Sequence, residues 1–320
     1  MPLDPNVQTL LARLNNQKET PCETITAAEH RAKTLAQTKP TGPSPTVAAV
    51  EERRLPAPDR ELSTTVYTPV GNGPFPLLLY FHGGGFVLPS LPHHDYLCRA
   101  FCCGANCVVV AVDYRLAPEE RFPAATDDCM AVTRWAAHRA GELNVDPMRI
   151  GVAGDSSGGA LAAVTALRCR DEGGPPLVAQ LLLCPLTAYH TPPTPSGLAY
   201  ADGYLMTRAW LIWYLQHYVS AAEAAHPYAF PLAAPDLRDL PPALIITAEY
   251  DILRDEGERY AARLERAHVP TTQIRYLGMI HGFFAMPGLL DQAQQAIDVS
   301  VAWLKEGFGN VRGGNHDNLC

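Results

Sequence analysis

Two neighbouring serines in the segment GVAGDSSGGA (151–160) are the residues best placed to do chemistry. A serine hydroxyl becomes a strong nucleophile only with a base in reach and a third group that orients this base. When such a serine occupies a sharp turn between a strand and a helix, the residues two before and two after it come too close for side chains. Ser156 has Gly154 and Gly158 at these positions. Centred on Ser157, the pattern would place an aspartate at the first position, so the spacing predicts Ser156 as the nucleophile.

The acid expected to assist Ser156 follows it in the chain. For a nucleophile at such a turn between a strand and a helix, the order of the three groups along the chain is serine, then aspartate or glutamate, then histidine. Asp251 comes directly after the apolar run 243–248, where a strand would end. Glu249 and Asp255 compete for the role, the first on the predicted strand and the second in the helix predicted after it. Position favours Asp251.

His281 is the predicted base. It lies in a loop after the next predicted strand, between Gly278 and Gly282. A lone histidine is more often structural than catalytic. His281 differs because it meets the chain order, the loop position and the glycine-rich surroundings together.

A second glycine-rich segment, HGGG (82–85), follows an apolar run and could bind negative charge. Successive glycines let the backbone turn its N–H groups toward a developing oxyanion, and the first N–H of the helix after the nucleophile joins them. We predict Gly84, Gly85 and Ser157 as the donors. The segment lacks the GK[ST] sequence of a phosphate-binding P-loop. His82 is expected to fix the loop by a hydrogen bond rather than to act as a base.

His82, Asp113 and Ser156 also occur in the chain order of trypsin-like proteases. Those domains are built of strands alone, whereas here apolar β-branched runs alternate with helical patterns. Such alternation is typical of a mostly parallel sheet flanked by helices. The predicted strands are 47–56, 61–69, 76–81, 107–114, 149–156, 179–186, 242–250 and 271–278, of which the first two form an antiparallel edge. The predicted helices are 93–105, 122–141, 158–172, 254–268 and 289–306.

Two segments fall outside this alternation. Residues 1–40 carry an apolar helical stripe, and Thr26 with Glu29 forms a possible capping box before a second helix. Residues 205–219 predict an aromatic helix. The stripe consists of Leu3, Val7, Leu10, Leu11 and Leu14, and the aromatic residues are Trp210, Trp213, Tyr214 and Tyr218.

These two segments predict a helical cap over the carboxyl edge of the sheet, where ligands bind in such folds. The cap comprises 1–45 and 188–222. The catalytic domain comprises 46–187 and 223–310, and the tail 311–320 is expected to be disordered.

Composition excludes several classes of function. Of the 320 residues, 47% are hydrophobic, and the net charge of −8 without a basic run excludes a nucleic-acid or anionic-membrane partner. No stretch approaches the ~18 apolar residues of a membrane span, and no signal segment is evident, so we expect a cytoplasmic protein. Four cysteines lie on one predicted helix and its exit without a paired CxxC motif. We interpret Cys98, Cys102, Cys103 and Cys107 as reduced structural thiols rather than a metal site.

Six motifs in order resemble one family. They are HGGGF (82–86), DYRLAPE (113–119), FPAA (122–125), GDSSGG (154–159), DILRDEG (251–257) and GMIHGF (278–283). Together they resemble the hormone-sensitive-lipase-like esterases, or bacterial family IV, of the α/β-hydrolase fold. The resemblance implies that Ser156, Asp251 and His281 form a catalytic triad. Members usually have alanine at Ser157 and proline at Ile252, so this chain departs from the pattern twice.

The resemblance implies a serine carboxylesterase that hydrolyses short-chain esters through an acyl-enzyme, without a metal or organic cofactor. Its partner would be a small-molecule ester, and the protein would be a monomer or a homodimer. We expect Phe86, Tyr189, Leu205 and Met206 to line the substrate pocket, although ordinary packing would explain them equally well. An amidase or deacetylase acting on aryl amides would use the same triad. A non-catalytic receptor of this fold would lack the histidine that His281 supplies.

Overall fold

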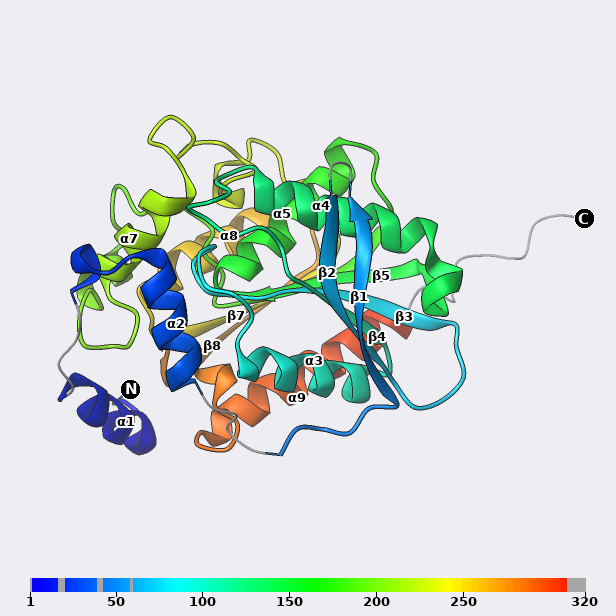
Figure 1. Cartoon of the computed structure of the whole chain (residues 1–320). Coiled ribbons are helices and arrows are strands. Elements are labelled where there is room, and N and C mark those ends of the chain that lie inside the picture. Colours follow the sequence, from blue (N-terminus) through cyan, green and yellow to red (C-terminus); the bar gives the residue numbers. More distant parts are fainter. Residues whose placement is uncertain (1, 17–20, 39–42, 58–59, 310–320) are drawn as a thin grey trace, which may run out of the picture.

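The computed structural model describes residues 2–16, 21–38, 43–57 and 60–309, so the tail 311–320 lies outside the described residues. Eight strands of the described chain form one sheet in the order β1-β2-β4-β3-β5-β6-β7-β8 (Figure 1). From β4 to β8 along this order the neighbours are parallel, and only β2 is antiparallel to both of its neighbours. The strands are β1 (Ala49–Ala57), β2 (Arg60–Thr68), β3 (Phe75–Phe81), β4 (Val108–Val112), β5 (Val145–Asp155), β6 (Leu177–Leu183), β7 (Ala243–Tyr250) and β8 (Thr271–Ile280). The predicted mostly parallel sheet is confirmed.

The predicted antiparallel edge is also confirmed. β1 pairs with β2 from Ala49 opposite Thr68 to Ala57 opposite Arg60, and β2 then pairs with β4. The hairpin therefore joins the parallel strands at one side of the sheet.

Helices cover both faces of this sheet (Figure 1). α3 (Pro92–Ala105) and α9 (Asp291–Gly309) lie on one face, and α4 (Ala124–His138), α5 (Ser157–Asp171) and α8 (Arg254–Arg266) lie on the other. The pattern of β3 explains why both faces need cover, because side chains of a strand point alternately to its two sides. Leu77 and Leu79 are buried in the core with α4, α5 and α8. Leu78 and Tyr80 are buried in the core with α3 and α9.

The remaining α-helices lie in the two segments predicted as a cap: α1 (Pro5–Asn15), α2 (Ala27–Gln37), α6 (Pro195–Ala199) and α7 (Arg208–Tyr218), with the 3-10 turn η1 (Cys22–Thr24). Three further 3-10 turns lie outside these segments: η2 (Ala140–Leu143), η3 (Pro231–Ala233) and η4 (Phe283–Ala285). The predicted capping box of α2 is present: Thr26 N–H donates to Glu29 at 2.9 Å, and Glu29 N–H donates to the Thr26 hydroxyl at 3.3 Å.

The two cap segments contact each other across the chain. The His30 ring on α2 stacks on Trp210 of α7 with centroids 4.3 Å apart, and its Nε2 lies 2.6 Å from the Tyr214 hydroxyl. α1 instead buries Val7 and Leu11 in the core that includes α3 and α9. The division into a cap and a catalytic domain stays a prediction.

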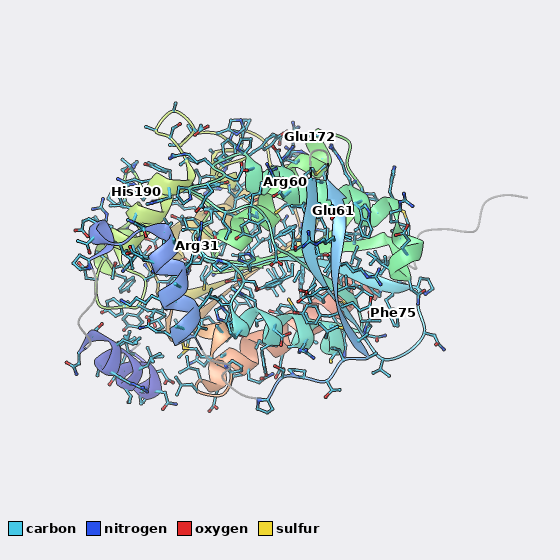
Figure 2. The ribbon with its side chains drawn as sticks, in the orientation of Figure 1. Arg31, Arg60, Glu61, Phe75, Glu172 and His190 are labelled. Carbon is cyan, nitrogen blue, oxygen red and sulfur yellow. The ribbon has the colours of Figure 1, made fainter. Side chains whose placement is uncertain are left out.

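Arg31 on α2 ties the N-terminal segment to the sheet domain and points toward the body of the molecule (Figure 2). Its guanidinium donates to the carbonyls of Val87 and Ala117, each at 2.7 Å, and pairs with Glu119. Val87 follows the HGGG segment closely, so α2 is held beside this loop.

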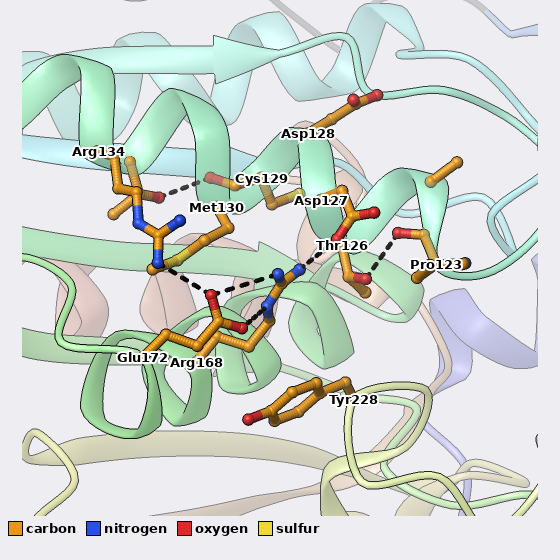
Figure 3. A network of polar contacts seen from close by, with 12 residues as sticks. Pro123, Thr126, Asp127, Asp128, Cys129, Met130, Arg134, Arg168, Glu172 and Tyr228 are labelled. Atoms are coloured by element: carbon orange, nitrogen blue, oxygen red, sulfur yellow. Dashed lines mark hydrogen bonds and ion pairs between the residues drawn. The ribbon is translucent and has the colours of Figure 1, made fainter. Parts of the chain in front are cut away.

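A network of charges joins α4 and α5 on the opposite side of the sheet from α3 (Figure 3). Arg168 pairs with Asp127 at 2.7 Å and with Glu172 at 2.6 Å, and Arg134 also pairs with Glu172 at 2.9 Å. The Arg168 guanidinium lies over the Tyr228 ring at 5.5 Å. Because the pairs share partners, they act as a network rather than as isolated surface contacts, which usually contribute little.

The cysteines and helices bear on two further predictions. The cysteines of the described chain are free thiols, with Cys98, Cys102 and Cys107 buried and Cys103 exposed. In the same described residues, no helix combines the length and apolarity that crossing a membrane requires.

Candidate active site

Ser156 occupies the turn between β5 and α5. Its φ of 53° and ψ of −118° are strained for a residue with a side chain. The neighbours pack so closely that a Cβ on Gly154 would overlap the Gly158 carbonyl, and a Cβ on Gly158 would overlap the carbonyl of Phe81. Glycine at these two positions therefore allows the turn, as the spacing predicts.

Three side chains from separate loops form one hydrogen-bonded chain. His281 Nε2 lies 3.1 Å from Ser156 Oγ, and His281 Nδ1 lies 2.8 Å from Asp251 Oδ2. Asp251 follows β7 and His281 follows β8. The other Asp251 oxygen accepts the Leu253 N–H at 2.8 Å, which orients the carboxylate. All three side chains are buried.

The two competing carboxylates have other partners. Glu249 accepts the Gly278 N–H at 2.8 Å, and Asp255 accepts the Ser196 N–H at 2.7 Å. Asp251 is thus the one of the three that meets His281.

The charge of Asp251 raises the affinity of His281 for a proton. Burial by itself lowers the pKa of His281, but the Asp251 charge and hydrogen bond outweigh it, so this pKa lies above its ordinary value. A buried imidazole beside a serine hydroxyl and a fixed carboxylate can accept the serine proton and hold the resulting positive charge.

The HGGG loop lies next to these hydrogen-bonded residues, and its backbone adopts a conformation that favours glycine. φ is 119° at Gly84 and 62° at Gly85, and a Cβ on Gly85 would overlap the Tyr214 ring. Within the described chain, the N–H groups of Gly84 and Gly85 have no hydrogen-bond acceptor. Ser157 begins α5, where the first N–H groups lack a partner within the helix. Their role as donors to an oxyanion stays a prediction.

Asp155, directly before Ser156, holds one end of the HGGG loop. Its Oδ1 accepts the Gly83 N–H at 3.0 Å and the Tyr80 hydroxyl at 2.6 Å. Burial opposes its ionisation, but His94, at 3.5 Å, and the Tyr80 hydroxyl help to outweigh burial, so the pKa of Asp155 lies below its usual range. A buried anion therefore fixes the loop beside Ser156.

Ser157, directly after Ser156, holds the other end. Its hydroxyl accepts the Phe86 N–H at 3.3 Å. Tyr114 donates to the His82 carbonyl at 2.7 Å. The His82 ring bonds the Gly83 carbonyl at 2.7 Å, and burial, together with His94, lowers the pKa of His82 to about 4. A neutral His82 thus hydrogen-bonds within the loop, as the sequence analysis expected.

Comparison with known proteins identifies the family. Residues 78–285 match the model of a family described by the α/β-hydrolase fold. The chain belongs to this family.

Individual relatives agree with the family match. The esterase LipI of Mycobacterium tuberculosis is 40% identical over 80% of this chain and 81% of its own length. An ethyl acetate hydrolase of Pseudomonas putida is 37% identical over 72% of each chain. The solved structure of a hyperthermophilic esterase from Pyrobaculum calidifontis superposes with a TM-score of 0.89 at 37% identity and covers 96% of this chain and 99% of its own. The resemblance to the hormone-sensitive-lipase-like group is confirmed.

The residues predicted to line the pocket occupy different places in this α/β-hydrolase. Phe86 is buried with its ring stacked on Tyr218 at 3.6 Å between centroids. Tyr189 lines a small cavity of about 20 Å³, enough for one water molecule, beside Ile252. Met206 is half-buried and Leu205 is 40% exposed. Their role in substrate binding stays a prediction.

Glu256 is a buried acid of this hydrolase that the sequence analysis did not single out. Its Oε1 accepts the N–H groups of Thr187 at 2.7 Å and Ala188 at 3.1 Å. Burial raises its pKa to about 8 despite these two hydrogen bonds, and the nearby Asp251 adds to the effect. Glu256 thereby holds the start of the insert that follows β6.

Cys184 was also missed, although a signal was available, because it directly follows β6 just as Asp251 follows β7. Its sulfur lies within 4.8 Å of a carboxylate oxygen of Asp251 and of a ring nitrogen of His281. Burial, followed by the Asp251 charge, raises the pKa of the Cys184 thiol well above its ordinary value. The thiol therefore stays protonated beside the carboxylate that hydrogen-bonds His281.

Proposed function

We propose that the protein hydrolyses short-chain carboxylic esters through an acyl-enzyme formed on Ser156. Its relatives include carboxylic ester hydrolases, and the chain is a member of this class. The observation that carries the proposal is the hydrogen-bonded chain from Ser156 through His281 to Asp251, beside the free N–H groups of Gly84 and Gly85.

In the first half of the reaction, His281 Nε2 takes the proton of Ser156 as Oγ attacks the ester carbonyl. Asp251 stabilises the imidazolium that forms and keeps its Nδ1–H oriented. The carbonyl oxygen becomes an oxyanion, which accepts hydrogen bonds from the N–H groups of Gly84, Gly85 and Ser157. Fixed backbone dipoles of this kind need no reorganisation when the charge develops.

In the second half, the tetrahedral intermediate collapses and the alcohol leaves with the proton from His281. A water molecule then gives a proton to the same nitrogen and attacks the acyl group on Ser156. Collapse of the second intermediate releases the carboxylic acid and returns the proton to the serine.

The aromatic residues over the HGGG loop favour substrates with short acyl or alcohol groups. The Tyr214 ring packs against Gly85, and Phe86 stacks on Tyr218. Both tyrosines lie on α7, so this helix limits the space above the oxyanion donors. A substrate of this size is consistent with the name of one relative, an ethyl acetate hydrolase. A cytoplasmic location and a monomeric or homodimeric state stay predictions.

Hydrolysis of p-nitrophenyl esters from acetyl to palmitoyl tests the proposal, with a matched p-nitroanilide to separate ester from amide hydrolysis. We expect wild-type activity to peak on the shortest esters and Ser156→Ala to abolish it. Ser300→Ala is the matched control, because Ser300 is also buried and donates to the Ala296 carbonyl. A folded wild type inert on all esters, or an active Ser156→Ala, would contradict the proposal.

A further inference from the structure

Cys184, Asp251 and His281 form a compact cluster of metal-ligating atoms. Each residue offers one ligand atom, and these atoms lie within 4.8 Å of one another. The three residues directly follow β6, β7 and β8, which are neighbours in the sheet. In the ester hydrolysis derived above, the imidazole is the base and the carboxylate orients it. The reaction needs no thiol at this place.

The chemistry of the three donors matches soft divalent metals. Thiolate, imidazole and carboxylate are the ligands that bind zinc in proteins, at about 2.0–2.3 Å in tetrahedral geometry. A divalent ion with one thiolate, one carboxylate and one neutral imidazole has no net charge, so its burial avoids the cost of an isolated ion. The three ligand residues are buried, with Cys184 and Asp251 each 1% exposed and His281 7% exposed.

We propose that Cys184, Asp251 and His281 form an inhibitory site for a thiophilic divalent metal ion of the zinc and cadmium class. A water molecule would complete the fourth position of a tetrahedral site. The inhibition rests on the proposed function, whereas the binding itself does not.

The protons that Cys184 and His281 lose or move on binding explain why a bound metal ion stops the reaction. The thiol proton of Cys184 leaves to solvent when sulfur binds the metal. His281 must bind through Nδ1, so the Nδ1 proton is lost and a proton occupies Nε2 instead. Nε2–H can no longer accept the Ser156 proton. The Nδ1 to Oδ2 distance must open from 2.8 Å to about 3.3 Å for tetrahedral coordination, a small movement.

Titration of Cd²⁺ and Zn²⁺ against ester hydrolysis tests the site. We expect reversible loss of wild-type activity that EDTA restores. Cys184→Ala and Cys184→Ser should need at least about tenfold more metal for half inhibition, each measured against its own metal-free rate, because one of three protein ligands is gone. Cys129→Ala is the control, because this buried free cysteine lies on α4, and it should behave as wild type.

A second readout does not depend on activity. The ultraviolet absorbance of a cadmium–thiolate bond should appear in Ser156→Ala and disappear in the double variant with Cys184→Ala. Absorbance that persists without Cys184, or equal metal sensitivity of wild type and Cys184→Ala, would overturn the metal site. Neither result would affect the ester hydrolase proposal, which depends on the rates of wild type and Ser156→Ala.

Discussion

The base side and the oxyanion side of the candidate site are held in different ways. On the base side, Asp251 and His281 reach Ser156 from loops after β7 and β8, so charges and hydrogen bonds join residues 30 and 125 positions apart. On the oxyanion side, Asp155 and Ser157 adjoin Ser156 and hold the HGGG loop at both ends. The role proposed for the first arrangement is to move a proton, which requires titratable side chains. The role proposed for the second is to stabilise charge with fixed backbone N–H groups, which requires an immobile backbone.

The largest effect is expected on the base side from Asp251→Asn. The amide cannot stabilise the imidazolium and favours the wrong tautomer of His281, so kcat should fall about 10⁴-fold. Asp255→Asn and Glu249→Gln are matched controls, because these carboxylates bond Ser196 and Gly278 instead. Steady-state kinetics on p-nitrophenyl acetate measures all three. A control as damaging as Asp251→Asn would mean that the acid is assigned to the wrong residue.

Gly85→Ala should produce the largest effect on the oxyanion side. The added Cβ would overlap the Tyr214 ring, and the φ of 62° disfavours alanine. The loop must therefore move, and its N–H donors no longer point toward the oxyanion. We expect kcat to fall about 10²- to 10³-fold, the usual result of losing an oxyanion donor. Gly173→Ala has a similar φ of 66° but open space around it, so it should cost stability only. Rates of both variants, compared with their thermal unfolding, separate these effects; equal rates would show that Gly85 does not position donors.

Ser157→Ala should produce a smaller effect on the same side. The variant keeps the Ser157 N–H but loses the hydroxyl that accepts the Phe86 N–H. One hydrogen bond contributes about 0.5–1.5 kcal/mol, so kcat should fall about tenfold or less while KM stays near the wild-type value. Tyr114→Phe removes the donor to the His82 carbonyl in the same loop, and the double variant should lose less than the product of the two single effects, because both changes loosen one loop. A dead Ser157→Ala would instead assign the nucleophile to Ser157.

The smallest effect concerns pH and the base side alone. His281 must be neutral to accept a proton, so kcat/KM should decline as pH falls through its pKa. Because Asp251 raises this pKa, the midpoint should lie above the ordinary 6.5. The residual activity of Asp251→Asn should show a lower midpoint, since the charge that raises the pKa is gone. A wild-type midpoint near that of an ordinary carboxyl group would contradict His281 as the base.

Predictions from local pattern agreed best with the structure where the pattern was long and regular. The predicted strand 76–81 is β3, and the capping box at Thr26 and Glu29 is present. The predicted helix 122–141 was too long: α4 ends at His138, because Arg139 leaves helical geometry and a separate 3-10 turn follows. Gly141, two residues after Arg139, is a residue typical of a helix end, so the earlier ending could have been predicted from the sequence.

The contacts behind the site were harder to predict. Cys184 stands after a strand like Asp251, but the sequence does not show that its thiol lies within 4.8 Å of the carboxylate 67 residues later. The Asp155 contacts with Tyr80 and Gly83 likewise join separate strands and loops.

The sequence by itself determined the register of the turn around Ser156, since glycines are needed where the backbone approaches most closely, and the order of strands and helices along the chain. Only the tertiary structure decided which carboxylate meets His281, how Asp155 and Ser157 hold the loop, and that α2 packs on α7. Periodicity and turn residues act over a few positions and can be read directly. Distances between loops depend on which strands lie side by side, and that is set by packing of the whole sheet.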